Sequence, residues 1–142
     1  HLYEAGLPVP RPVAALAQRH LLVFYSGSLL TEYLEGCQSL ASRILSGATS
    51  DIPWQAVGTV IRRFHDEGVM HRDLNASNIL IGPEQIYLID FDKGRQVISS
   101  REASWKKGNL QRLRRSLDKL FEPDGGIENF WTQLSYGYQK SD

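Results

Sequence analysis

Three stretches of the chain place apolar residues at the three- and four-residue spacing of an amphipathic helix. The first is predicted to begin at Asp51-Ile52-Pro53, with Pro53 in its first turn, and to end at Gly68, a typical C-terminal stop. Its apolar positions are Trp54, Val57, Ile61 and Phe64. The other two helices are predicted by Leu110, Leu113, Leu117 and Leu120, and by Ile127, Phe130, Trp131 and Leu134. Residues 38–46 predict a fourth, shorter helix.

The β-type runs are short. Residues 20–26 and 28–34 predict two adjacent strands with a turn at Gly27, and residues 79–81 and 86–89 predict a small hairpin around Gly82-Pro83. Residues 1–5 are typical of the end of a helix, which Gly6 and the proline-rich linker to Pro12 terminate. The pattern therefore predicts an α+β fold with a mostly helical body and few strands.

Composition narrows the class of protein. The 142 residues suit one domain, and 42% apolar residues are enough for a packed core. The single cysteine, Cys37, forms no internal disulfide, which fits a reducing compartment. We find no apolar run of the roughly 18 residues that span a membrane, and no secretory signal pattern at the N-terminus.

The charge is zero overall but unevenly distributed. Residues 91–120 hold nine Lys or Arg against three Asp or Glu, a local excess of six positive charges. Such a block attracts phosphate groups or an anionic membrane surface. A solvated helix face is the alternative explanation.

The strongest chemical signal is a pair of motifs on either side of the 79–89 hairpin. Residues 71–78 read His-Arg-Asp-Leu-Asn-Ala-Ser-Asn, which fits the kinase catalytic loop H-R-D-L-x-x-x-N at every fixed position. Twelve residues after Asn78, Asp90-Phe91-Asp92 occupies the place of the kinase D-F-G element. The sequence therefore indicates a protein-kinase-like phosphotransferase.

These residue types suit phosphoryl transfer, which depends on positioning and charge neutralisation. Asp73 is the candidate catalytic residue, since its carboxylate can orient an acceptor hydroxyl and take its proton. Asn78 and Asp90 supply the oxygen ligands that Mg²⁺ prefers. His71 is expected to hold the loop through hydrogen bonds, and Phe91 to pack inward. The alternatives are that Asp73 and Asn78 are turn or capping residues.

A second match lies upstream, where Thr31-Glu32-Tyr33-Leu34-Glu35-Gly36 resembles a kinase hinge. By that resemblance the Glu32 carbonyl and the Leu34 amide bind adenine, and Thr31 lines the rear of the pocket. The predicted nucleotide-binding set is completed by Asn75, Asn78 and Asp90. An edge strand that runs into a turn would give the same pattern.

The chain departs from ordinary protein kinases at two positions and lacks an A-P-E segment after Asp90. Asn75 stands where serine/threonine kinases usually carry a lysine, and Asp92 replaces the third D-F-G residue. Over most of its length it resembles instead the 3-deoxy-D-manno-octulosonic acid (Kdo) kinases of Gram-negative lipopolysaccharide synthesis. The segments that carry this resemblance are Gly6–Pro12, His71–Leu80, Tyr87–Arg95 and Trp105–Leu117.

The resemblance implies an enzyme that transfers phosphate from ATP, with Mg²⁺, to the 4-hydroxyl of Kdo on a lipid A precursor. It further implies a peripheral protein at the cytoplasmic face of the inner membrane. We expect no nucleic-acid partner and no obligate protein partner. The basic residues expected to include the acceptor-binding groups are Lys93, Arg95, Lys106, Lys107, Arg112, Arg114 and Arg115.

The usual N-terminal lobe of a kinase is not recognisable here. No G-x-G-x-x-G precedes residue 31, the first lysine is Lys93, and only Glu4 could be the helix glutamate. We therefore expect residues 1–34 to be a remnant of the N-lobe with the hinge, and residues 35–142 to be the C-terminal catalytic lobe. On this interpretation the chain is the C-terminal portion of a longer enzyme and binds ATP weakly by itself. An atypical protein kinase, an antibiotic phosphotransferase and a pseudokinase scaffold remain alternatives.

Overall fold

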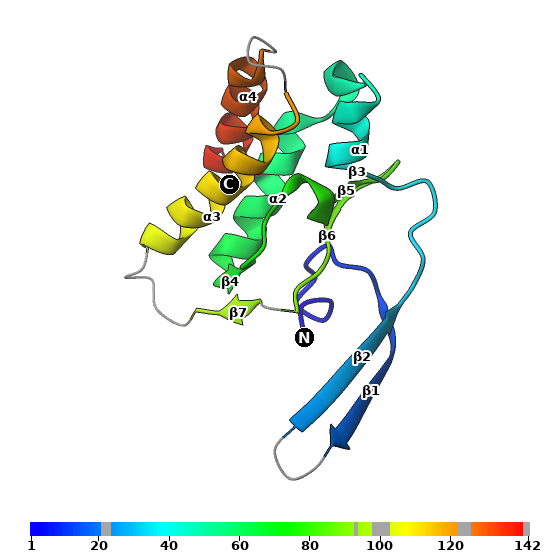
Figure 1. The fold of residues 1–142 in the computed structure, drawn as a ribbon. Coiled ribbons are helices and arrows are strands. Elements are labelled where there is room, and N and C mark those ends of the chain that lie inside the picture. The colour runs from blue at the N-terminus through cyan, green and yellow to red at the C-terminus, as the bar shows by residue number, and fades with distance from the viewer. Residues whose placement is uncertain (21–23, 93, 98–102, 122–125, 141–142) are drawn as a thin grey trace.

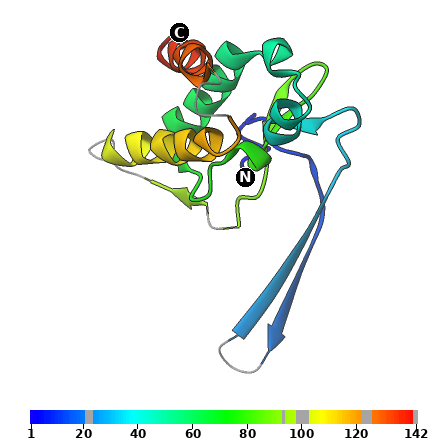
Figure 2. The same cartoon turned by 45° about the horizontal axis from the view of Figure 1, so that its top comes forward.

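The computed structural model describes residues 1–20, 24–92, 94–97, 103–121 and 126–140. Within these ranges it has a helical body and a long two-stranded hairpin that projects from it (Figures 1 and 2). The helices are α1 (Leu40–Leu45), α2 (Trp54–Asp66), α3 (Ala103–Asp118) and α4 (Ile127–Gln139), with short 3₁₀ turns η1 (Thr49–Asp51) and η2 (Ala76–Asn78). The strands are β1 (Pro12–His20), β2 (Phe24–Thr31), β3 (Gln38–Ser39), β4 (Val69–Met70), β5 (Ile79–Ile81), β6 (Ile86–Leu88) and β7 (Arg95–Gln96).

The three helices predicted from the apolar spacing are confirmed as α2, α3 and α4, and α2 begins later than predicted. Pro53 is the residue before α2 rather than part of its first turn, because Thr49–Asp51 already forms a separate 3₁₀ turn. Gly68 follows the last turn of α2 with φ +70°, a conformation that glycine adopts without steric cost. At the shortest helix, residues 38–39 pair with β5 as β3, so α1 begins only at Leu40, capped by the Ser39 hydroxyl.

Helices α2 and α4 pack closely because two glycines face the opposite backbone. A Cβ on Gly58 would lie 2.0 Å from the Leu134 carbonyl oxygen, and one on Gly137 would lie 1.9 Å from that of Gln55. Above this contact Trp54 stacks on Phe130, with ring centroids 5.2 Å apart. The fully buried side chains of α2, α3 and α4 meet in one hydrophobic core with those of the β5–β6 hairpin.

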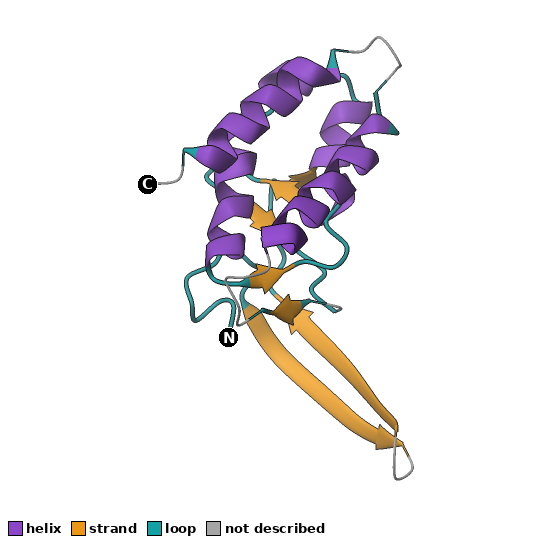
Figure 3. Ribbon diagram, turned by 90° about the vertical axis from the view of Figure 1, so that its left-hand side faces the viewer, coloured by secondary structure: helices purple, strands orange, loops and turns teal. Residues whose placement is uncertain are grey.

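Figure 3 shows the small strands between the helices and the projecting hairpin. The predicted hairpin at 79–89 is confirmed as β5 and β6, paired antiparallel with Ile79 opposite Leu88, and β3 extends this sheet. A separate two-stranded sheet joins β4 to β7. The catalytic motif thus begins directly after β4 and ends at β5.

The prediction for the first two strands was wrong. Residues 12–20 and 24–31 form one antiparallel hairpin, with Arg19 opposite Tyr25 and Ala15 opposite Leu29. Gly27, predicted to be the turn, lies inside β2 opposite Ala17, and the connection at 21–23 falls outside the described residues. The ladder is irregular between Pro12 and Ala14, where proline has no amide to donate.

Residues 1–7 have the hydrogen bonds of a helix C-terminus, as predicted. The amide of Leu7 donates to the Leu2 carbonyl and that of Gly6 to the Tyr3 carbonyl, with Gly6 at φ +72°. Leu7 is buried in the core, and the Leu88 amide donates to the Pro8 carbonyl, so this segment is tied to β6. Over the described residues, no helix combines the length and apolar character that crossing a bilayer requires.

Candidate active site

The catalytic-loop motif runs from the end of β4 into η2 and is held by its own polar side chains. The Asn75 amide oxygen accepts from the backbone amides of Ser77 and Asn78, at 2.8 and 3.2 Å, which makes Asn75 the cap of η2. Its amide nitrogen donates to the Asp73 carbonyl at 3.1 Å. In this structure Asn75 therefore shapes the loop, and its nucleotide contact stays a prediction.

His71 has the structural role that the sequence predicts. Its Nε2 lies 2.8 Å from the Ile89 carbonyl oxygen, which can only accept, so Nε2 carries the proton. Its Nδ1 then accepts from the Asp73 amide at 3.2 Å. Burial lowers the pKa of His71, which keeps the ring neutral as this pattern requires. The ring packs on Phe91, which in turn stacks on Phe64 of α2.

Asn78 and Asp90 lie on either side of the β5–β6 hairpin, whose pairing brings the two chain segments together. The Ile89 amide donates to the Asn78 carbonyl at 3.1 Å, which places Asp90 one residue from that contact. The Asn78 side-chain nitrogen donates to the Asp73 carbonyl at 3.0 Å. The side-chain oxygen of Asn78 is therefore the atom that can bind a cation. A carboxylate and an amide oxygen are donor types that fit Mg²⁺.

Asp90 has an unusual backbone conformation. Its φ of +65° makes it the single non-glycine residue with positive φ in the described part of the chain. Asp and Asn are the non-glycine residues that adopt this region most readily, and such strain concentrates at functional sites. The conformation turns the chain sharply between β6 and the inward-packed Phe91, which leaves the Asp90 side chain exposed.

The Asp73 carboxylate is exposed at the surface of the loop, as an acceptor-binding group must be. Arg112 of α3 approaches it, with Nη1 3.9 Å from Oδ1. Both side chains are about half exposed, so this ion pair adds little to stability. It does place a cation beside the candidate catalytic carboxylate.

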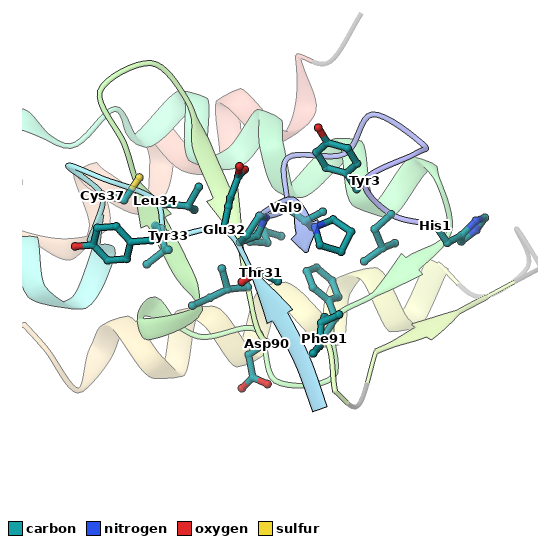
Figure 4. A pocket seen from close by; sticks show the side chains of 17 residues that line it. His1, Tyr3, Val9, Thr31, Glu32, Tyr33, Leu34, Cys37, Asp90 and Phe91 are labelled. Carbon is teal, nitrogen blue, oxygen red and sulfur yellow. The ribbon is translucent and has the colours of Figure 1, made fainter. Parts of the chain in front are cut away.

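A pocket of about 620 Å³ lies between the β1–β2 hairpin and the body, next to Asp90. Figure 4 shows Thr31 near its middle, Tyr33 and Cys37 toward one end and Tyr3 toward the other. Of the predicted nucleotide-binding residues, this pocket is lined by Thr31, Glu32, Leu34 and Asp90. Sequence reasoning missed its apolar walls, which are formed by Val9, Leu29, Leu80, Leu88 and Ile89 among others.

Glu32 also closes the base of the hairpin. Its carboxylate accepts from the Arg11 amide at 3.1 Å, and its own amide donates to the Arg11 carbonyl at 2.9 Å. Neither contact uses the Glu32 carbonyl oxygen, which is the group predicted to meet adenine. The hinge prediction is therefore compatible with the observed bonds.

The predicted acceptor-binding residues fall into different environments. Lys106 pairs with Asp66 at 3.2 Å, and Arg114 pairs with Asp118 and Glu128 and lies over the Trp131 ring. The carboxylates around Arg114 raise the pKa of its guanidinium. Exposed positions are held by Arg95, Lys107, Arg112 and Arg115, of which Arg112 reaches Asp73, while Lys93 lies outside the described residues.

Two further residues of α3 contact the loop and were not predicted. The Asn109 side-chain nitrogen donates to the His71 carbonyl at 2.6 Å, and the Ser116 hydroxyl accepts from the Ala76 amide at 3.1 Å. Their positions in the helix gave a usable signal, because Asn109 and Ser116 lie three or four residues from the buried Leu113 and so share its face of the helix.

Comparison with known proteins places this arrangement in a family. A family model described as the lipopolysaccharide kinase (Kdo/WaaP) family matches residues 1–138. A protein named 3-deoxy-D-manno-octulosonic acid kinase from Vibrio cholerae is 44% identical over 120 residues, which are 84% of this chain and 49% of that protein. One of the same name from Actinobacillus succinogenes is 38% identical over 144 residues, covering 97% of this chain and 59% of that protein.

Two solved structures share the fold. "WaaP in complex with acyl carrier protein" matches with a TM-score of 0.75 at 18% identity, covering 99% of this chain and 63% of that one. "Glucosamine kinase (crystal form B)" matches with a TM-score of 0.57 at 15% identity, covering 97% and 53%. These matches confirm the predicted kinase-like fold. The chain spans about half the length of the curated relatives it matches.

Proposed function

The chain belongs to the lipopolysaccharide kinase (Kdo/WaaP) family, and on this basis we propose that it carries the catalytic loop and metal site of an ATP-dependent kinase. The proposed acceptor is the 4-hydroxyl of a Kdo residue on a lipid A precursor. The observation that supports the proposal is the way the two kinase motifs are joined by hydrogen bonds. The Asn78 side chain donates to the Asp73 carbonyl, and the amide of Ile89, the residue before Asp90, donates to the Asn78 carbonyl.

ATP is proposed to bind in the 620 Å³ pocket, with adenine between the hairpin and the apolar floor of Leu80 and Leu88. Thr31 lies at the middle of that pocket, and the hinge residues Glu32 and Leu34 supply backbone groups at its edge. Asp90 lines the same pocket, so a nucleotide seated there directs its phosphates toward Asp90.

Mg²⁺ is proposed to be held by Asn78 and Asp90, whose oxygen donors suit a hard cation. When bound, the ion neutralises charge on the phosphates. The protein contributes the rigidity of this pair, because Asn78 is fixed by its bond to the Asp73 carbonyl and Asp90 by its strained backbone.

In the transfer step the acceptor oxygen bonds to the γ-phosphorus while the bond to the β–γ bridging oxygen breaks and ADP leaves. Asp73 orients the hydroxyl and receives its proton. The loop fixes the backbone of Asp73 by hydrogen bonds. The Asp73 amide donates to His71 Nδ1, and the side chains of Asn75 and Asn78 donate to the Asp73 carbonyl.

The acceptor carries a carboxylate and lipid phosphates, so it is drawn to basic residues. Arg112 is the best placed of these, since it already lies beside Asp73. Exposed Arg95, Lys107 and Arg115 are proposed to extend the basic surface toward an anionic membrane. Peripheral association with the cytoplasmic face of the inner membrane follows from this acceptor.

The decisive experiment uses the complete gene product, as wild type and as Asp73→Asn. Each is incubated with labelled ATP, Mg²⁺ and a Kdo-bearing lipid A precursor, with a generic protein acceptor and free glucosamine in parallel. Label on the lipid that disappears in the variant supports the proposal. Label only on protein or glucosamine would show that the acceptor is not the Kdo lipid. No transfer to any of them would favour a pseudokinase.

A further inference from the structure

Helix α3 lies along both ends of the catalytic loop, against β4 and against η2. Three of its residues face the loop at spacings of three and four, which is one helix face. Asn109 bonds the His71 carbonyl, Arg112 approaches Asp73, and Ser116 bonds the Ala76 amide. The contacts at the two ends go to the loop backbone, so they act on its shape.

We propose that Asn109 is a positioning residue for the phosphotransfer step, and this inference rests on the function proposed above. Its 2.6 Å bond holds the carbonyl of His71, the first residue after β4. The Nδ1 atom of His71 in turn accepts a hydrogen bond from the Asp73 amide. A shift of the His71 peptide therefore moves Asp73 directly, and displacements of about 1 Å at a catalytic group cost about 10²-fold in rate.

The orientation of Asn109 is fixed by what lies on its other side. Since a carbonyl only accepts, the Asn109 nitrogen faces His71 and its oxygen faces His65 Nε2, at 3.1 Å. His65 Nε2 must therefore carry the proton. His65 Nδ1 then accepts from the Tyr138 hydroxyl at 2.7 Å. One hydrogen-bond chain, Tyr138–His65–Asn109–His71, thus joins α4, α2 and α3 to the loop.

This chain of hydrogen bonds has no alternative arrangement of similar energy. Asn109 and His65 are almost completely buried, at 5% and 2% exposure, so a broken bond would leave an unpaired polar group away from water. Rotating the Asn109 amide would set its oxygen against the His71 carbonyl, and no tautomer of His65 removes that repulsion. The amide is therefore a rigid spacer between α2 and the first residue of the loop.

The test compares Asn109→Asp and Asn109→Ala with wild type in the complete gene product. Aspartate keeps the shape and an acceptor for His65 but removes the N–H donor, and alanine removes the donor without adding charge. Gln111→Glu, an exposed amide-to-acid change on the same helix, is the matched control. We measure kcat and the ATP KM per folded molecule with the Kdo acceptor, and amide hydrogen exchange over residues 71–78.

We expect both Asn109 variants to lose about 10- to 100-fold in kcat with an ATP KM within about twofold of wild type. Exchange in 71–78 should be about tenfold faster while α1 and β5–β6 stay protected. A kcat within twofold of Gln111→Glu, or faster exchange spread evenly over the chain, overturns the proposal. If the wild type fails to phosphorylate the Kdo lipid, the proposed function fails, and the exchange comparison still decides the role of Asn109.

Discussion

The helical body and the β1–β2 hairpin are built on different principles, although both border the pocket. In the body, apolar side chains of four helices and a small sheet bury one another, and Leu134 is 0% exposed. In the hairpin, Val13, Leu16, Leu29 and Leu30 are 59–67% exposed. The catalytic loop belongs to the first region and the roof of the pocket to the second. The candidate catalytic residues are thus supported by more buried contacts than the roof of the pocket is.

A leucine-to-alanine substitution in the helical body is expected to have the largest effect on the free energy of unfolding. Leu134→Ala should lower the free energy of unfolding by about 2–5 kcal/mol, because it leaves a cavity in a fully buried site between α2 and α4. Urea unfolding of this chain, followed by circular dichroism, measures the change. A loss below about 1 kcal/mol would mean that the body relaxes around the cavity and is not tightly packed.

The second prediction is a substitution in the body that lowers phosphotransfer activity without changing the free energy of unfolding. Asp90→Asn keeps a residue that tolerates φ +65° while it removes the carboxylate charge. We expect Mg²⁺-dependent transfer by the complete gene product to fall by about 10²- to 10³-fold, with urea unfolding unchanged. Asp92→Asn, which changes an exposed carboxylate two residues further on, is the matched control for charge. Equal activity losses in both variants would contradict a specific metal role for Asp90.

The third prediction concerns pH and the buried His65 of α2. Burial lowers its pKa to about 4, so folding disfavours the charged ring. Its contribution to stability is complete above the unfolded pKa of about 6.5 and is lost as pH falls toward 4. Between pH 7.5 and 5 the unfolding free energy should fall by about 2 kcal/mol from this group. His65→Gln removes the titration, and an equally steep pH dependence in that variant would disprove the assignment.

Sequence periodicity predicted the body well and the hairpin poorly, for one physical reason. Helix α2 buries Val57, Ile61 and Phe64 on one face, so its apolar spacing reports its contacts. Strand β1 is rich in alanine, and residues 12–16 of it are exposed, so its pattern carried no strand signal. The glycine inside β2 was taken for a turn.

The candidate site divides in the same way, because its motif residues could be recognised from the sequence and the contacts that support them could not. Asp73, Asn78 and Asp90 belong to motifs of fixed spacing, and the short hairpin between Asn78 and Asp90 brings the backbones on its two sides together. Asn109 lies 38 residues from its partner His71, and only the packing of α3 against β4 brings them together. Contacts of this kind are a property of the tertiary structure, and no local pattern reports them.

The smallest predicted effect completes the comparison. Leu30→Ala removes the same atoms as Leu134→Ala, but Leu30 is 61% exposed, so little transfer energy is lost and no cavity forms. In this chain we expect a change of about 0.5 kcal/mol or less in the unfolding free energy. Hydrogen exchange of the β2 amides should meanwhile be faster than that of α2, since a two-stranded hairpin is marginal in water. A loss near that of Leu134→Ala would show that the hairpin shares the core of the body, and the distinction between the two regions would fail.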